Sequence, residues 1–293
     1  MNSSSPQMRL ALVTPSYAKD FDLCSDLVRS VLRNTESDVE HHIIVPKSDV
    51  PVFESLAGIR TIISDTRSYL PGSIKQVPHL NAWINYRAPF PPIRGWMAQQ
   101  IVKLAAAARS QSDVVLLIDS DVLLIRPVSA SSFCRSGRLK LFEMPSGIDA
   151  SLPRHHLWHA TARRLLGLPT YKASTLPDYI CWPCAWQPSV VRKMLARIEA
   201  VTGLPWPTAV GKELNFSEMI LYGVYVREVV GASEELALSD DMHCVNHSHE
   251  IALTERQLSQ MLTNAKPEDF AIMISAKSGT PLSVRRRFIN QLI

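Results

Sequence analysis

The stretch Val114-Val115-Leu116-Leu117-Ile118-Asp119-Ser120-Asp121, which continues as Val122-Leu123-Leu124-Ile125-Arg126-Pro127, decides the fold that we expect for this chain. Five apolar residues in a row are typical of a strand that is buried on both faces of a sheet. Alternate residues of an extended chain point to the same side. We therefore expect Asp119 and Asp121 to converge at the carboxyl end of a central strand, which is where open α/β sheets bind ligands.

The residues before this stretch predict a parallel sheet. Apolar runs and helical spacing indicate, in order, a strand at 10–13, a helix at 22–34, a strand at 42–45, a short helix at 49–57, a strand at 60–64 and a helix at 95–109. This alternation predicts an α/β fold of Rossmann type, with a mainly parallel sheet and helices on both faces. Residues 66–95 are rich in proline and aromatic side chains, and we expect them to be irregular and functional.

The second half of the chain has a looser pattern. We expect helices at 155–166, 188–201 and 213–222, extended chain at 179–186 and a strand at 225–230. No linker and no repeat separates the two halves, so the sequence predicts one continuous domain.

Composition excludes several classes of protein. The 293 residues carry 31 Lys and Arg against 27 Asp and Glu, and 46% are hydrophobic, which is typical of a globular protein and not of a disordered chain or a disulfide miniprotein. A net charge of +4 is too small to predict a nucleic-acid partner. No apolar run is long enough for a transmembrane helix. The five cysteines are an odd number and no export signal precedes them, so we expect a cytoplasmic protein.

The two aspartates predict a metal site. Adjacent carboxylates repel each other, and burying them unpaired is costly. A divalent cation removes both costs, and carboxylate oxygens suit Mn²⁺ or Mg²⁺, which in turn bind a diphosphate. The alternative is a polar turn between two strands.

The motif and its surroundings resemble the GT-A class of nucleotide-sugar glycosyltransferases. The matching pieces are Thr14-Pro15-Ser16-Tyr17 after the first strand, Ser64-Asp65 after the third, and the Asp-Ser-Asp triplet between apolar runs. The second half resembles an uncharacterised group of bacterial GT-A-like proteins through Phe216-Ser217-Glu218 and Leu221-Tyr222-Gly223. The resemblance implies a metal-dependent enzyme that moves a sugar from a nucleoside-diphosphate sugar, UDP favoured, to a saccharide, glycoconjugate or other hydroxyl acceptor. Residues 8–128 would bind the donor, and 129–293 would form the acceptor and catalytic half.

The resemblance also implies roles for single residues. Thr14, Pro15 and Tyr17 would edge the nucleoside, and Asp65 would contact the base or the ribose. Asp119 would approach the ribose at the metal site and Asp121 would hold the metal. Members of this class often bring a histidine from the C-terminal region to the metal, and the candidates here are His247 and His249, which share one face of an extended chain. We prefer His247, because Asn246 and Ser248 beside it can orient its ring.

The helix at 95–109 carries an unusual face. Trp96, Gln99, Gln100 and Lys103 recur at helical spacing on one side. Such a face suits donor hydroxyls or phosphate, with Lys103 as a point charge. The alternative is a solvated helix face over which Trp96 packs.

Two acids are candidates for the general base that takes the acceptor proton, and we prefer Glu218 to Asp178. Glu218 begins a short predicted helix, where the helix dipole favours the charged carboxylate, although it can equally be a capping residue. Asp178 lies in a turn before the Cys-Trp-Pro-Cys segment.

Basic and aromatic residues gather in 66–95 and 144–178, among them Trp83, Arg94, Arg154, His155 and Trp158. Aromatic rings stack on sugars and Arg binds phosphate, so these segments suit a saccharide or phosphorylated acceptor; the alternative is surface decoration of a lid. The run Arg285-Arg286-Arg287 suits peripheral contact with an anionic membrane, or else a solvated helix face.

Three other functions fit parts of the sequence. A nucleotidyltransferase shares the sheet and the carboxylates, but it usually has a glycine-rich phosphate loop that 14–20 lacks. A non-catalytic nucleotide- or glycan-binding module would keep the pocket alone. A zinc-stabilised protein would use Cys181 and Cys184 with His243, Cys244 and His247, whereas two buried thiols are the plainer interpretation.

Overall fold

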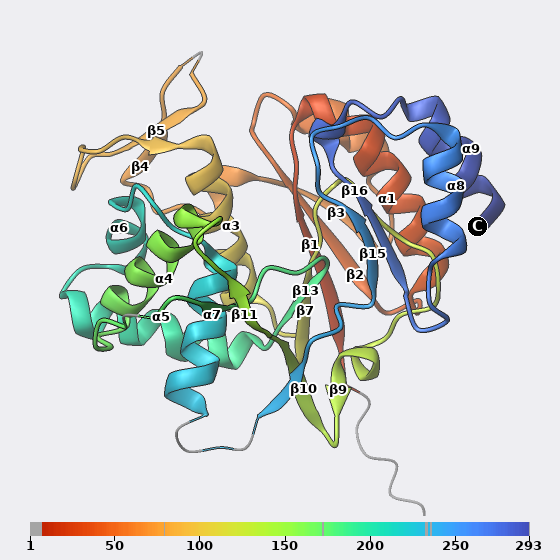
Figure 1. Ribbon diagram of the computed structural model, residues 1–293. Helices are drawn as coiled ribbons and strands as arrows, with labels where there is room; N and C mark the ends of the chain where they lie inside the picture. The colour runs from red at the N-terminus through yellow and green to blue at the C-terminus, as the bar shows by residue number, and fades with distance from the viewer. Residues whose placement is uncertain (1–7, 79, 172, 232–233, 235, 293) are drawn as a thin grey trace, which may run out of the picture.

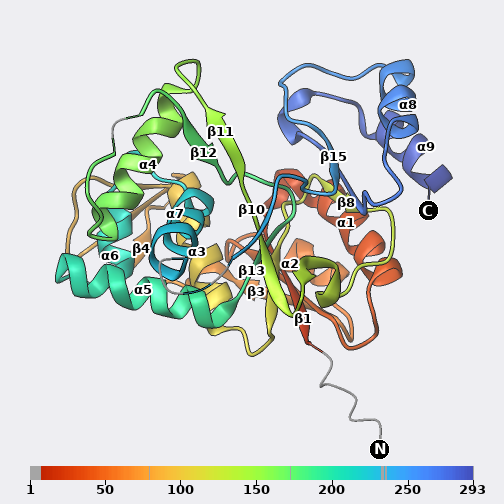
Figure 2. The same cartoon turned by 60° about the horizontal axis from the view of Figure 1, so that its bottom comes forward.

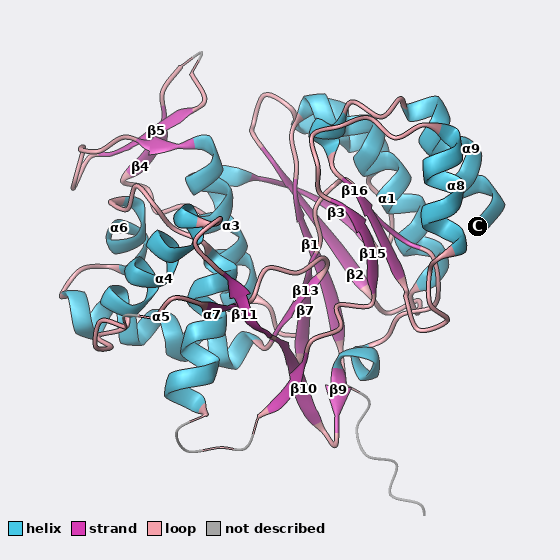
Figure 3. Cartoon of the chain, in the orientation of Figure 1, coloured by secondary structure: helices cyan, strands magenta, loops and turns pink. Residues whose placement is uncertain are grey.

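The computed structural model describes residues 8–78, 80–171, 173–231, 234 and 236–292. Its central layer is a five-stranded sheet in the order β13-β7-β1-β2-β3 (Figures 1 and 3). The strands are β1 (Leu10–Pro15), β2 (Glu40–Val45), β3 (Thr61–Asp65), β7 (Val114–Leu117) and β13 (Cys184–Trp186). The strands β7, β1, β2 and β3 run parallel, and β13 is antiparallel to β7. The predicted α/β class with a mainly parallel sheet is confirmed.

Helices cover both faces of this sheet, because successive residues of each strand point to opposite sides. Leu12 of β1 packs in one core with Leu27 of α1 (Phe21–Asn34), whereas its neighbour Val13 packs in the other core with Ile101 of α3 (Gly95–Arg109). Strand β7 alternates in the same way. The continuous apolar runs of the sequence therefore reflect burial on two faces.

Strands from the C-terminal part extend the structure beyond the Asp-Ser-Asp motif. β8 (Val122–Leu124) pairs antiparallel with β16 (Ala271–Ile274), which pairs parallel with β15 (Cys244–His247). Figure 2 shows α8 (Glu255–Thr263) and α9 (Leu282–Leu292) on this side of the molecule. Side chains from β8, β16 and α8 share one hydrophobic core with α1, so the two halves of the chain fold around common cores.

The other side of the central sheet carries the remaining large helices (Figure 2). They are α4 (Pro153–Leu165), α5 (Pro188–Thr202), α6 (Trp206–Gly211) and α7 (Glu218–Tyr225), and a short helix α2 (Val50–Phe53) follows β2. Three small sheets complete the fold: β4 (Ile74–Gln76), β5 (Ala82–Asn85) and β6 (Ile93–Arg94); β9 (Cys134–Arg135), β10 (Arg138–Phe142) and β14 (Ala237–Ser239); and β11 (Met144–Ile148) with β12 (Leu176–Asp178).

Three predictions of local structure are wrong. Residues 66–95 contain the antiparallel β4-β5-β6 sheet and are not irregular throughout. The predicted strand at 225–230 continues α7 as a π-helical turn, Val226–Val230, because its apolar residues bury one side of a helix against the main core; packing overrides the strand propensity of valine. Within 179–186 only the last three residues form a strand.

The arginine run in α9 is used inside the fold. Arg285 is buried and donates to the carbonyl groups of Ile274, Ser275 and Thr280. Arg286 pairs with Asp26 and Arg287 with Glu255. The interpretation as a solvated helix face is therefore wrong for Arg285. In the part of the chain that the structure describes, no helix has the length and apolar character needed to cross a bilayer.

Candidate functional site

The Asp-Ser-Asp motif lies where the strand order of the central sheet reverses. From β1 the chain moves outward to β2 and β3, and then returns to the other side of β1 with β7. Ligands of open α/β sheets bind outside the carboxyl ends of the strands at such a reversal. Ser16, after β1, and Ser120, after β7, join the two strand ends through a hydroxyl hydrogen bond of 2.8 Å.

Asp119 belongs to a buried ion-pair triad. The ammonium of Lys103 lies 2.9 Å from Asp119 Oδ1 and 3.2 Å from Glu218 Oε1. Burial lowers the pKa of Lys103, but the two carboxylates raise it more, so this side chain stays charged. Gln100, one turn earlier on α3, accepts a hydrogen bond from the Glu218 backbone N–H. Gln100 and Lys103 of the predicted polar face of α3 are therefore buried, and the interpretation as a solvated face is wrong for these two residues; Trp96 of the same face is exposed.

Asp121 is held from the opposite side. Its Oδ2 accepts a hydrogen bond of 2.8 Å from the Ala276 backbone N–H, and its carbonyl accepts one from Ile274. Burial, and then the charge of Asp119, raise the pKa of Asp121 to about 6, although Ala276 and Arg285 oppose the shift. Burial and Asp119 also raise the pKa of Asp20, so a third carboxyl group lies nearby.

The two aspartates fit a hard divalent cation. Asp119 Oδ1 is bound by Lys103 and Asp121 Oδ2 by Ala276, and among the described residues no other residue binds the remaining oxygen of either group. Carboxylate oxygens are the ligands that Mg²⁺ and Mn²⁺ prefer. Two neighbouring carboxylates that each have one oxygen without a protein partner are the arrangement that such an ion stabilises.

A large cleft opens beside the motif, outside the carboxyl ends of β1, β2 and β3. Its volume is about 1170 Å³, which is ample for a nucleotide sugar. Ser16 and Lys277, next in sequence to Ala276, line the end of the cleft closest to the motif. The described lining side chains include four cations and one acid: Lys19, Arg94, Arg154, Lys277 and Asp49. Such a lining favours an anionic ligand.

The residues predicted to bind the donor divide into two groups. Pro15, Tyr17 and Gln99 line the cleft, whereas the predicted donor residues Gln100, Lys103 and Asp119 do not. Thr14 does not, because its side chain is fully buried and its hydroxyl bonds to His41 Nε2 at 2.8 Å. Asp65 accepts hydrogen bonds from the Arg67 backbone N–H and side chain, at 2.9 and 2.7 Å, and so caps the turn after β3.

The predicted histidine ligands do not join the aspartates. His247 bonds through Nε2 to the Ile251 carbonyl at 2.7 Å, and His249 lies against its ring. Among the described residues, the one group of three ligand atoms from His, Cys, Asp or Glu that lie within 4.8 Å of one another is Asp241, His243 and Asp269. The expected set of Asp119, Asp121, His247 and His249 is therefore not assembled.

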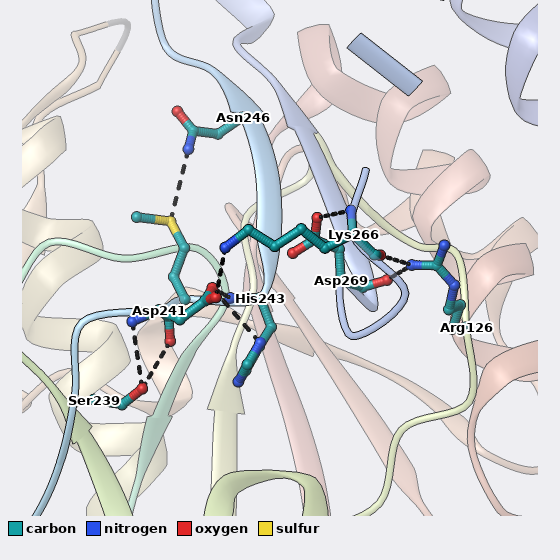
Figure 4. A network of polar contacts seen from close by, with 8 residues as sticks. Arg126, Ser239, Asp241, His243, Asn246, Lys266 and Asp269 are labelled. Atoms are coloured by element: carbon teal, nitrogen blue, oxygen red, sulfur yellow. Dashed lines mark hydrogen bonds and ion pairs between the residues drawn. The ribbon is translucent and has the colours of Figure 1, made fainter. Parts of the chain in front are cut away.

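The Asp241 group forms an ion-pair network (Figure 4). The Lys266 ammonium lies 2.8 Å from Asp241 Oδ2, and the Lys266 backbone N–H donates to Asp269 Oδ2 at 2.7 Å. Asp241 Oδ1 also accepts from the His243 backbone N–H. Lys266 thus contacts both Asp241 and Asp269, and this network ties two loops together. The cysteines of the zinc interpretation, Cys181 and Cys184, are buried free thiols.

The two predicted catalytic acids have different surroundings. Glu218, the first residue of α7, is buried against Lys103 behind the cap residue Ser217, whose hydroxyl accepts the Ile220 N–H. Asp178 Oδ2 lies 3.7 Å from His155 Nδ1, and burial raises the pKa of Asp178. His155 stacks on the cleft-lining Trp158 with ring centroids 4.4 Å apart. Asp178 is thus the acid closer to the aromatic wall of the cleft.

Several residues of the site carry no signal in the sequence. Ala276 contributes only its backbone, Arg285 comes from the far end of the chain, and Lys19 and Lys277 are isolated lysines. Lys103 does carry a signal in the sequence, because its spacing from Gln99 and Gln100 indicates a polar helix face.

Fold and site together define an α/β protein with paired carboxylates at the switch point of a parallel sheet, beside a cationic cleft. The chain belongs to the family described as "Family of unknown function (DUF6492)", whose profile matches residues 8–265. The matched range includes every predicted site residue. No curated protein matches the chain.

Proposed function

We propose that this protein is a metal-dependent glycosyltransferase that uses a nucleoside-diphosphate sugar. The observation that carries the proposal is the pair Asp119 and Asp121, each with one carboxylate oxygen bound in the fold, next to a cationic cleft whose lining residues Ser16 and Lys277 adjoin the motif. Fold alone does not define function, but a parallel-sheet cleft with a cation-binding pair and lysines at its edge suits a nucleotide diphosphate.

The chain's own groups would hold and orient the donor. Asp119 and Asp121 would bind Mn²⁺ or Mg²⁺ through their open oxygens, while Lys103 and the Ala276 N–H keep both carboxylates in place. When bound, such an ion supplies charge neutralisation for a departing diphosphate. Lys277, beside Ala276 at this end of the cleft, adds a cation there. Pro15 and Tyr17 would contact the nucleoside.

The acceptor proton needs a base near the aromatic wall. We assign this part to Asp178, because burial raises its pKa toward the range in which a carboxylate takes up a proton, and His155 connects it to the wall. In an inverting transfer the acceptor oxygen bonds to the sugar, its proton passes to the base and the diphosphate leaves. Glu218 is assigned to positioning, because Lys103 holds it in an ion pair beside Asp119.

Calorimetric titration of UDP and of GDP, with and without Mn²⁺, tests the proposal. We expect UDP to bind only with Mn²⁺, and Asp121→Asn to weaken this binding at least tenfold. Asp38→Asn, which changes an exposed aspartate, is the matched control. Failure of both nucleotides to bind in the presence of Mn²⁺ would refute the proposal. Release of pyrophosphate from UTP would instead support a nucleotidyltransferase.

A further inference from the structure

The wall of the cleft contains an arginine that lies over two neighbouring tryptophan rings. The Arg154 guanidinium lies 5.1 Å from the ring centroid of Trp96 and 5.2 Å from that of Trp158. The two indole rings are themselves 5.8 Å apart. Trp96 comes from the first turn of α3, whereas Arg154 and Trp158 lie one turn apart on α4, so two helices build the group. Stacking on two rings restricts the guanidinium to one place in the cleft.

In the part of the chain that the structure describes, no acid neutralises this guanidinium. Among the described residues, Arg154 has no carboxylate partner and no hydrogen-bond acceptor; its neighbours are the two rings. The other arginines of α4 differ, because Arg163 pairs with Glu228 and Arg164 with Glu213. A guanidinium offers five N–H donors in a plane that matches a carboxylate or a phosphate. Arg154 thus presents unused charge and unused donors to the cleft.

The position of this group relative to the carboxylates indicates its ligand. Trp96 precedes Lys103 by seven residues on α3, which corresponds to about 10 Å along the helix axis. Lys103 contacts Asp119, and Gln99, between the two, lines the cleft. A group bound at Arg154 is therefore about one sugar residue or more from the aspartates. That distance suits the acceptor beside the donor, and not the diphosphate itself.

We propose that Arg154, Trp96 and Trp158 form the acceptor subsite, and that the acceptor is an acidic sugar whose carboxylate or phosphate binds Arg154. Trp96, which is 37% exposed, offers its indole ring to the sugar, whereas Trp158 is buried and carries His155 stacked on its ring. The N-terminus of α4 adds to the positive potential, because no side chain caps it and Arg154 lies in its first turn. This inference rests on the proposed transferase function, since the term acceptor has meaning only there.

Saturation-transfer NMR with three simple probes tests the subsite. Glucuronate carries a carboxylate, glucose 6-phosphate carries a phosphate and glucose is neutral. With wild-type protein we expect at least tenfold tighter binding of one or both acidic sugars than of glucose, and the stronger of the two names the anionic group. Arg154→Met should remove this preference, and Arg33→Met, which removes an exposed cation outside the cleft lining, should keep it.

Three results would overturn the inference: equal binding of glucose and both acidic sugars, no binding of either acidic sugar, or an unchanged preference in Arg154→Met. Arg154 is exposed, so the variant is expected to fold, and its thermal transition checks this.

A parallel titration of UDP with Mn²⁺ separates this inference from the proposed function. We expect Arg154→Met to keep the wild-type affinity for UDP within about twofold. A tenfold loss would assign Arg154 to the donor diphosphate and overturn the acceptor subsite, while leaving the transferase proposal intact. Absence of UDP binding in the wild type would refute the transferase proposal, and the NMR result would then describe an acidic-sugar site only.

Discussion

Removal of the Lys103 ammonium tests how much the ion pairs of Lys103 with Asp119 and Glu218 stabilise the fold. The ammonium is 3.2 Å from Glu218, and unit charges at that distance interact by about 5 kcal/mol at an effective dielectric constant of about 20. Glu218 is 6% exposed, so the substitution Lys103→Met leaves its charge buried without a partner. Breaking such pairs costs about 3–5 kcal/mol. Asp119 contributes less, because 37% of its side chain is exposed and solvent screens the pair.

We expect Lys103→Met to lower the free energy of unfolding by about 3 kcal/mol, at the low end of that range because Glu218 starts a helix, whose dipole favours its charge. Urea unfolding followed by circular dichroism measures this change. The double variant Lys103→Met/Glu218→Gln removes the stranded charge and should recover at least half of the loss. Lys75→Met, at an exposed lysine, should change stability by less than about 0.5 kcal/mol. A single variant within about 1 kcal/mol of wild type, or a double variant as unstable as the single one, would refute the reasoning.

Three further predictions follow from the structure. The pKa of Asp121 is raised from 3.8 to about 6 in the folded protein, so its ionisation costs stability as the pH rises from 3.8 to about 6. Because the metal binds the ionised carboxylate, the affinity for Mn²⁺ should fall about tenfold per pH unit below about 6. Calorimetry that finds a constant affinity from pH 7 to pH 5 would contradict this. Burial lowers the pKa of His155 and the charge of Asp178 partly opposes this shift, so Asp178→Asn should lower the pKa further. An unchanged NMR titration of His155 would show that the pair does not form. A Cβ atom at Gly223 would overlap the Tyr179 ring, so Gly223→Ala should cost about 1–3 kcal/mol of stability by overpacking, and wild-type stability would count against this close contact.

The central sheet was predictable because its signal is local. A run such as Val114–Leu117 must be buried on both faces, and turn residues mark where it ends, so the parallel strands and α1 and α3 follow from the sequence. The same approach wrongly predicted a strand at the valine-rich segment 225–230, because side-chain packing against the core outweighs strand propensity there. The antiparallel β4-β5-β6 sheet was not predicted, because its strands have at most four residues.

In the candidate site, too, local features were predictable and contacts between distant residues were not. By itself, the sequence determined that Asp119 and Asp121 stand at the end of a buried strand, and it marked Lys103 by its place on a polar helix face. Only the tertiary structure decided that Lys103 lies between Asp119 and Glu218, that Ala276 holds Asp121, and that Arg154 lies over two tryptophan rings. The physical reason is that a strand end and a helix face are set by backbone periodicity over a few residues. An ion pair or a ring stack between residues far apart in the chain depends on how whole elements pack, and no local pattern records it.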